Sequence, residues 1–268
     1  MNIISKILYN KRQSNTCALI PFITAGYPNI EITTEALYEL NCKGADIIEL
    51  GIPYSDALAD GPMIQNSSKV ALEKGVYVDQ VLDLLSKVTY KLAAPIVVFS
   101  YYNPILARGL DRFIMEIAFA GAKGLIIPDL PLEETDYLVA LCKFYSIELI
   151  LFISPSTSYD RISLIVSKSP GSLYFVSTNG VTGMRDNLNM SVNTLCQYIK
   201  SKTDKSIMLG FGISTVEQVY QISKWDIDGI VMGSAFINIL SNTKIRHLEV
   251  IEKLGSFCNS IKLSINHQ

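Results

Sequence analysis

The 268-residue chain has the composition of a globular protein, with 49% hydrophobic and 18% charged residues. Its 23 basic and 25 acidic side chains give a net charge of -2, which excludes the basic excess typical of a nucleic-acid-binding protein. Apolar runs such as 93–99 are far shorter than the roughly 20 residues of a membrane-spanning helix, so we expect neither a nucleic-acid nor a membrane partner.

The chain begins with MNIISKILYNKRQS, whose hydrophobic spacing predicts an ordinary first helix. This segment has neither the long apolar core nor the small-residue cleavage site of a secretory leader, so we expect a reducing compartment. Abundant Ile, Asn, Ser, Tyr and Lys suggest an AT-rich genome. The expected location is therefore the bacterial cytoplasm or, for a plastid-encoded chain, the plastid stroma.

Cysteine and histidine usage excludes several kinds of site. The two histidines, His247 and His267, both lie near the C-terminus, which disfavours a histidine-dependent triad or metal site. The cysteines are widely spread and form no CxxC pair: Cys17, Cys42, Cys142, Cys196 and Cys258. We therefore expect no metal and no disulfide framework, and acid–base chemistry carried by carboxylates, Lys or Tyr.

Eight short apolar runs predict eight strands. Most are continuous rather than alternating, which is typical of strands covered on both faces. In chain order they begin at Cys17, Asp46, Pro95, Gly124, Ile147, Ser172, Ser206 and Asp228.

Helix-like patterns follow many of these runs, at 31–42, 111–120, 133–145 and 215–223, with Asp111 and Thr215 as expected N-caps. Eight strand–helix units predict an α/β fold, a single (β/α)8 TIM barrel over 1–268 with an extra N-terminal helix. A doubly wound open sheet is the rival, but the turn after the first strand is not GxGxxG.

In a barrel the C-terminal end of each strand faces the active site. The first strand ends at Phe22, and the second ends at Glu49 in a run that should be buried. Desolvation there would raise the pKa of the carboxyl group and suit it to proton transfer, unless a Lys or Arg pairs with it. An extended loop should follow, carrying Asp56 and Asp60. A lone loop Asp is more often a turn former, yet two carboxylates at one mouth give a possible acid–base pair.

The ends of the later strands add aromatic and glycine-rich segments. The third strand ends in FSYY at 99–102, and the sixth leads from Tyr174 into STNGVTG at 177–183. After the seventh and eighth strands, Gly212 and Gly233 allow close backbone approach to an anion. Ser234 could donate a hydroxyl and cap a short helix. Together these ends predict a phosphate site, although turn glycines that merely close a barrel remain the alternative.

The ordered motifs of this chain resemble the tryptophan synthase alpha family. The 17-residue string ELGIPYSDALADGPMIQ at 49–65 is the most specific, and PFITAGYP, SYYNPIL, GLIIPDLPLEE, STNGVTGMR, GFGIS and GIVMGSAF extend the resemblance over 21–236. The resemblance implies a (β/α)8 barrel that cleaves indole-3-glycerol phosphate to indole and glyceraldehyde 3-phosphate. It also implies a beta subunit that holds pyridoxal phosphate and receives the indole, in an alpha2-beta2 tetramer, and no cofactor in this chain.

Site residues follow from the same resemblance. Glu49 and Asp60 match the catalytic carboxylates, with Glu49 as the acid–base that moves the proton and Asp60 accepting the indole N–H. Asp56 and Ala57 match the loop that faces the beta subunit, where the family usually has Pro in place of Ala57. The substrate-binding positions are Phe22, Phe99, Tyr174, Thr182, Gly183, Phe211, Gly212, Gly233 and Ser234.

The segment 177–185 is predicted to be a lid that carries Thr182 to Asp60, against the alternative of a flexible surface loop. Three other functions remain open at this point. They are a free-standing lyase that releases indole, a silent barrel that acts as a binding partner, and another phosphate-binding barrel such as a sugar-phosphate isomerase.

Overall fold

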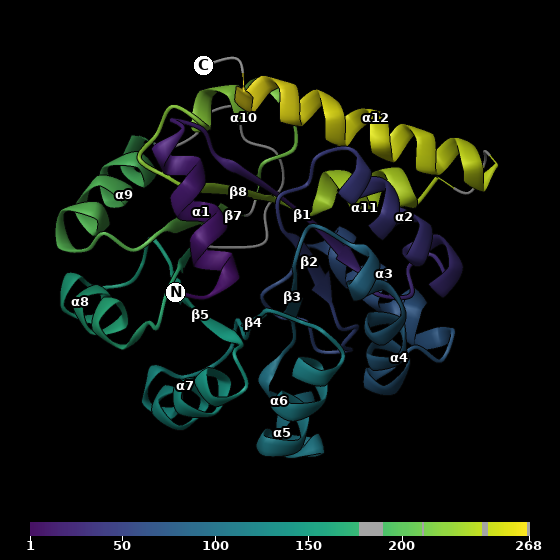
Figure 1. Ribbon diagram of the computed structural model, residues 1–268, viewed down its shortest axis with the longest axis horizontal. Helices are drawn as coiled ribbons and strands as arrows, with labels where there is room; N and C mark the ends of the chain where they lie inside the picture. The colour runs from purple at the N-terminus through teal and green to yellow at the C-terminus, as the bar shows by residue number, and fades with distance from the viewer. Residues whose placement is uncertain (177–189, 211, 243–245, 267–268) are drawn as a thin grey trace.

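The computed structural model describes residues 1–176, 190–210, 212–242 and 246–266. In it, parallel strands hydrogen-bonded in chain order form a closed barrel in which β8 pairs with β1, and helices surround the ring (Figure 1). The expected (β/α)8 barrel is thus confirmed, and the open sheet is excluded. The strands are β1 (Ala18–Thr24), β2 (Ile48–Gly51), β3 (Ile96–Phe99), β4 (Gly124–Ile126), β5 (Glu148–Ile153), β6 (Leu173–Val176), β7 (Ile207–Gly210) and β8 (Gly229–Met232).

Helices cover the outer face of the barrel, and an additional helix precedes β1 as expected. They are α1 (Ile3–Gln13), α2 (Ile30–Cys42), α3 (Pro62–Glu73), α4 (Val78–Val88), α5 (Tyr102–Arg108), α6 (Leu110–Phe119), α7 (Thr135–Phe144), α8 (Tyr159–Lys168), α9 (Met190–Lys202), α10 (Val216–Ile222), α11 (Ser234–Leu240) and α12 (His247–Asn266), with short 3-10 turns η1 (Thr89–Lys91) and η2 (Leu132–Glu134). None of these described helices combines the length and apolar character needed to cross a membrane.

The strands are buried along almost their whole length because side chains on one face fill the barrel and those on the other meet the helices. This double burial explains why the apolar runs of the sequence do not alternate. The pairing register matters for the site: Phe22 on β1 lies opposite Glu49 on β2, and Gly51 lies opposite Phe99 on β3. The first three strands therefore place Phe22, Glu49 and Phe99 near one another at one end of the barrel.

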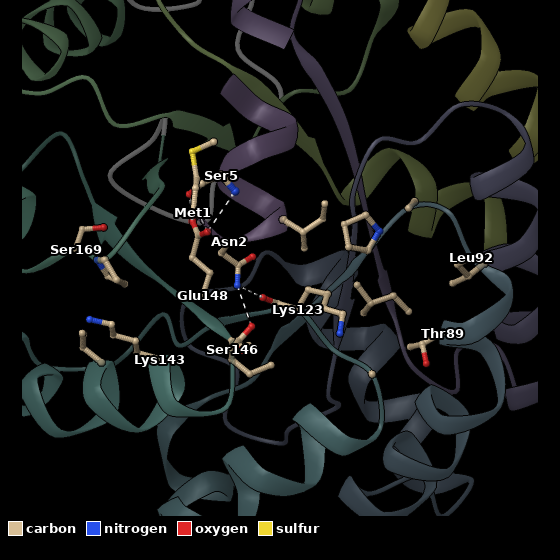
Figure 2. A pocket seen from close by; sticks show the side chains of 18 of the residues that line it. Met1, Asn2, Ser5, Thr89, Leu92, Lys123, Lys143, Ser146, Glu148 and Ser169 are labelled. Atoms are coloured by element: carbon tan, nitrogen blue, oxygen red, sulfur yellow. Dashed lines mark hydrogen bonds between the residues drawn. The ribbon is translucent and has the colours of Figure 1, made fainter. Parts of the chain in front are cut away.

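Helix α1 lies across the N-terminal end of the barrel, where it is held by its polar residues. The Asn2 side chain caps the helix by accepting from Ile4 N–H at 3.0 Å, and its Nδ2 donates to the carbonyls of Lys123 and Ser146 at 3.2 and 2.9 Å (Figure 2). Ser5 Oγ donates to the buried Glu148 carboxylate (2.7 Å), as Figure 2 also shows. A cavity of about 910 Å³ lies beside these contacts, at the end of the barrel opposite the carboxyl ends of the strands.

Ion pairs fix the other end of α1. Lys11 Nζ lies 2.8 Å from Asp46 Oδ1, just before β2, and Arg12 Nε lies 2.6 Å from Asp228 Oδ1, just before β8. Arg12 also donates to the second Asp228 oxygen at 2.9 Å. Because Asp228 is buried, this arrangement satisfies a charge that would otherwise be costly to bury.

Two expected helix caps had different outcomes. Thr215 is the N-cap of α10, and its Oγ1 accepts from Gln218 N–H at 3.2 Å while Gln218 Oε1 accepts from Thr215 N–H at 3.2 Å. The prediction of Asp111 as an N-cap is wrong. Gly109, with φ +91°, is both the C-cap of α5 and the N-cap of α6. Asp111 therefore falls inside the first turn of α6, where its carboxylate accepts from the Tyr137 hydroxyl.

Candidate active site

Glu49 is a buried carboxylate inside the ring of strands. It is 1% exposed, and its Oε2 has no hydrogen-bond partner among the residues that the structure describes. Burial raises the pKa of this carboxyl group to about 8, and the negative charge of Asp60 adds to the shift. No cation contributes to this pKa, so the alternative of a Glu paired with Lys or Arg is excluded for the described part of the chain. At neutral pH Glu49 can hold a proton and give it up.

Asp60 closes the loop 52–61 that links β2 to α3. It is 3% exposed, and its Oδ2 accepts from the Tyr101 hydroxyl at 3.0 Å. Burial raises the pKa of Asp60 to about 6, while the Tyr101 hydrogen bond opposes that shift. The two carboxylates thus differ in their environment, which separates their protonation states near neutral pH.

Two residues that sequence reasoning did not select hold Asp60 in place. The Tyr101 hydroxyl also accepts from Ala59 N–H at 3.0 Å, so one phenol oxygen binds both the loop backbone and the carboxylate. Gln65 Nε2 donates to the carbonyls of Ala57 (3.1 Å) and Asp60 (3.0 Å). The signals were present, since Tyr101 belongs to the FSYY segment expected at the end of the third strand and Gln65 ends the specific 49–65 string. Neither pattern shows what the side chain contacts.

The aromatic residues expected around the substrate ring are all buried. Phe22 and Phe99 pack edge to face with ring centroids 5.6 Å apart, and Phe22 lies opposite Glu49. Tyr174 stacks on Phe152 at 4.5 Å, a contact that sequence reasoning missed. Burial raises the pKa of Tyr174 far above its ordinary value, and the negative charges of Glu49 and Asp60 add to the shift.

The glycines expected to bind an anion follow β7 and β8, and one of them, Gly233, lies close to the aromatic group. Gly212 has φ +78°, a conformation that favours glycine. A Cβ atom on Gly233 would lie 3.2 Å from Phe22 Cδ1 and from Ile64 Cδ1, so this backbone passes close to the ring. The expectation that Ser234 caps the short helix is wrong, because Gly233 is the N-cap of α11 and Ser234 is its first residue. Ser234 still lies just after the end of β8, as the sequence predicted.

Three expected substrate residues, Thr182, Gly183 and Phe211, lie outside the described residues, as does the whole segment 177–185 that was expected to be a lid. Within the described ranges, no group of three or more His, Cys, Asp or Glu is arranged to hold a metal ion.

The two expected partner-facing residues lie differently in the loop. Asp56 is exposed, whereas Ala57 is buried and its carbonyl is bound by Gln65. The neighbouring Leu58 is 83% exposed, a position that sequence reasoning did not select. An exposed leucine beside a carboxylate gives this loop an apolar and a charged feature on the same surface.

Comparison with known proteins gives consistent matches over the whole chain. The family model described as "Tryptophan synthase alpha chain" matches residues 8–266. The tryptophan synthase alpha chain of the red alga Gracilaria tenuistipitata var. liui is 56% identical over 266 residues, covering 99% of this chain and 98% of the relative. That of the cyanobacterium Synechococcus elongatus is 46% identical over 268 residues, with coverage of 100% and 98%. A tryptophan synthase structure from M. tuberculosis, in an aminoacrylate-bound form, aligns with a TM-score of 0.87 at 28% identity, covering 99% and 100%.

Proposed function

The chain belongs to the tryptophan synthase alpha chain family, and from this premise we propose that Glu49 and Asp60 carry out its reaction. It is a lyase that cleaves indole-3-glycerol phosphate, it needs no cofactor of its own, and it works with a beta subunit that holds pyridoxal phosphate. One observation carries the assignment: two buried carboxyl groups at the same barrel mouth have pKa values raised to about 8 and about 6.

These protonation states fit a retro-aldol cleavage. Protonated Glu49 donates its proton to indole C3, and the positive charge that develops spreads to the ring nitrogen. Ionised Asp60 stabilises that charge by accepting the ring N–H. The carbon–carbon bond then breaks as the adjacent glycerol hydroxyl gives its proton to the Glu49 carboxylate, which yields the aldehyde and restores the starting acid. The proton that leaves the hydroxyl replaces the one delivered to C3, so no other reactant is required.

The other site residues are assigned to binding. Phe22, Phe99 and Tyr174 form the wall against which an indole ring can pack, and the glycine backbones after β7 and β8 supply N–H donors for the phosphate, with Ser234 beside them. Thr182, Gly183 and Phe211 remain predictions of the family resemblance. For the beta subunit, Asp56 and Leu58 together are the proposed contact, since both are exposed on the Asp60 loop.

Replacing Glu49 with Gln tests the assignment. Loss of general acid–base catalysis typically costs about 10²–10⁴-fold, so indole release should fall by at least that lower factor. Exposed Glu252 on α12 offers a matched control, and Glu252→Gln should keep the wild-type rate. Near-normal turnover by Glu49→Gln, with the circular dichroism spectrum unchanged, would overturn the role given to Glu49.

Indole release with and without a beta subunit tests the partner contact. We expect slow release by the chain alone and a large increase with the beta subunit, which Asp56→Ala or Leu58→Ala should weaken by raising the amount of beta subunit needed. Fast release without a partner would instead indicate a free-standing lyase, and no release under either condition would indicate a silent barrel.

We also propose that the chain works in the plastid stroma or in a bacterial cytoplasm. Relatives from red algae and cyanobacteria support this location. Fractionation of the source cells followed by immunoblotting would test it, and enrichment in any other compartment would contradict it.

A further inference from the structure

The loop 52–61, which carries Asp60, contacts the Tyr101 side chain at two places. At its far end, the Tyr101 hydroxyl contacts Ala59 N–H and the Asp60 carboxylate, both at 3.0 Å. Near the start of the same loop, the Tyr54 ring packs on the Tyr101 ring with centroids 5.3 Å apart and planes tilted by 32°. The two ends of the loop 52–61 therefore both contact Tyr101, which lies between β3 and α5.

The backbone beside Tyr101 is held by a residue that follows β4, which pairs with β3. Asp129 Oδ1, after β4, accepts from Tyr102 N–H at 2.8 Å, and Phe99 meets the Tyr101 ring edge-on with centroids 6.0 Å apart. These contacts set where the Tyr101 side chain begins. The direction in which its ring points depends on what packs against the ring face, and the loop supplies Tyr54 there.

Tyr54 is itself held in place. It is half-buried, and its hydroxyl accepts from Asn103 Nδ2 on α5 at 3.1 Å. Tyr54 lies two residues before the exposed Asp56, so it stands on the same loop as the proposed partner contact and the reacting carboxylate.

We propose that Tyr54 is a positioning residue: its ring holds the Tyr101 hydroxyl against Asp60 and so orients that carboxylate toward the indole N–H. This role rests on the proposed function of Asp60 and adds a residue to which neither motif nor spacing assigns a task.

The arrangement has an electrostatic consequence. The titratable groups that face Asp60 are Glu49 on β2, Tyr101 at the start of α5 and Tyr174 on β6. Among them, the Tyr101 hydrogen bond is the contribution that lowers the pKa of Asp60. A displaced Tyr101 ring would weaken this bond, raise the pKa of Asp60 and move the acid limb of the pH–rate profile to higher pH.

Three variants test the proposal: Tyr54→Leu, Tyr54→Phe and the control Tyr90→Leu. Tyr90 is 74% exposed on η1, ahead of β3, and so lies away from the site. We expect Tyr54→Leu to lower kcat by about tenfold, the worth of a strong aromatic pair, with little change in KM. Tyr54→Phe keeps the ring and should restore kcat to within about twofold, because the ring is the part that packs on Tyr101.

The rates are measured over a range of pH, for the chain alone and with saturating beta subunit, so that weakened docking does not imitate lost positioning. Carboxyl ¹³C NMR of Asp60 provides a second readout, in which Tyr54→Leu should raise the titration midpoint and Tyr90→Leu should not. Thermal unfolding shows whether each variant is folded.

Wild-type kcat and midpoint in Tyr54→Leu would overturn the proposal, as would equal losses in Tyr54→Leu and Tyr54→Phe. Asp60→Asn separates this result from a failure of the proposed function. If Asp60→Asn is inactive while Tyr54→Leu is normal, only the positioning role fails. If Asp60→Asn keeps wild-type turnover, the assignment of Asp60 itself fails.

Discussion

A Cβ atom on Gly210 would lie 2.1 Å from the hydroxyl oxygen of Tyr174 and 2.6 Å from its Cζ. These two residues sit on the paired strands β7 and β6, where Val176 lies directly opposite Gly210. The Tyr174 ring therefore occupies the space that any side chain at position 210 would need. Glycine is required here by a neighbouring ring rather than by its own backbone conformation.

This contact predicts a pair of substitutions that compensate for each other. Gly210→Ala should displace Tyr174 from the carboxylates and lower indole release by about tenfold or more, since overpacking a buried site typically costs about 1–3 kcal/mol. Adding Tyr174→Val removes the ring and should recover part of the rate. Activity assays on the two single variants and the double variant measure the coupling, and strictly additive losses would contradict it.

The pH dependence of catalysis follows from the two raised pKa values. In the proposed mechanism, Asp60 gains a proton below about pH 6 and can no longer accept the indole N–H, and Glu49 loses the proton for C3 above about pH 8. The profile of kcat/KM for the chain should therefore be bell-shaped, with its plateau between these limits. Initial rates of indole release at constant ionic strength provide the measurement. A rate that stays constant from about pH 5 to about pH 9 would contradict the protonation states assigned to Glu49 and Asp60.

Stability should depend on pH in the opposite sense to that of an ordinary salt-bridged carboxylate. Because the folded-state pKa of Glu49 is raised from 4.5 to about 8, the folded chain holds a proton that the unfolded chain releases. The resulting stability is complete below the unfolded value and is lost as the pH rises through about 8, at most about 5 kcal/mol.

Glu49→Gln removes this titration. The wild-type chain should lose melting temperature between about pH 5 and about pH 9, and the variant should lose clearly less, at about 2–4 °C per kcal/mol. Differential scanning calorimetry at the two pH values measures the difference, with Glu252→Gln again as the control. Equal losses in wild type and Glu49→Gln would show that Glu49 titrates normally in the folded state.

The anion site can be tested apart from the carboxylates. Gly212 has φ +78°, so Gly212→Ala strains the backbone by roughly 1–2 kcal/mol and should move the N–H groups proposed to bind phosphate. We expect KM to rise about tenfold and inhibition by inorganic phosphate to weaken by a similar factor.

Gly75 is a matched control for that strain. Its φ is +77°, and an added Cβ would meet nothing within 4 Å. Gly75→Ala should therefore lower stability as Gly212→Ala does while leaving KM unchanged. An increase in KM in both variants would assign the effect to general strain rather than to phosphate binding.

The sequence predicted the barrel because continuous apolar runs recur at strand-like length, and every one of those runs overlaps a strand of the structure. It also predicted that Glu49 is buried, because this carboxylate lies at the end of such an apolar run. The hydrogen bond between Tyr101 and Asp60 could not be predicted in the same way. These residues are 41 positions apart and meet only after the loop 52–61 has folded back over β3.

Local patterns failed where backbone conformation decided the outcome. Asp111 looked like a helix cap, but the N-cap of α6 is Gly109, two residues earlier, where the backbone has a positive φ. Ala57 and Leu58 are both apolar, and nothing in their spacing shows that the first is buried and the second exposed.

The pairing of β1 with β8 sets an order of events during synthesis. The edge of β1 that pairs with β8 has no partner until residues 229–232 have been synthesised. The ion pair between Arg12 and Asp228 cannot form before then either. At about 5–20 residues per second, this interval lasts on the order of tens of seconds. The nascent chain therefore spends that time with an open strand edge, the state in which chaperone protection would matter most.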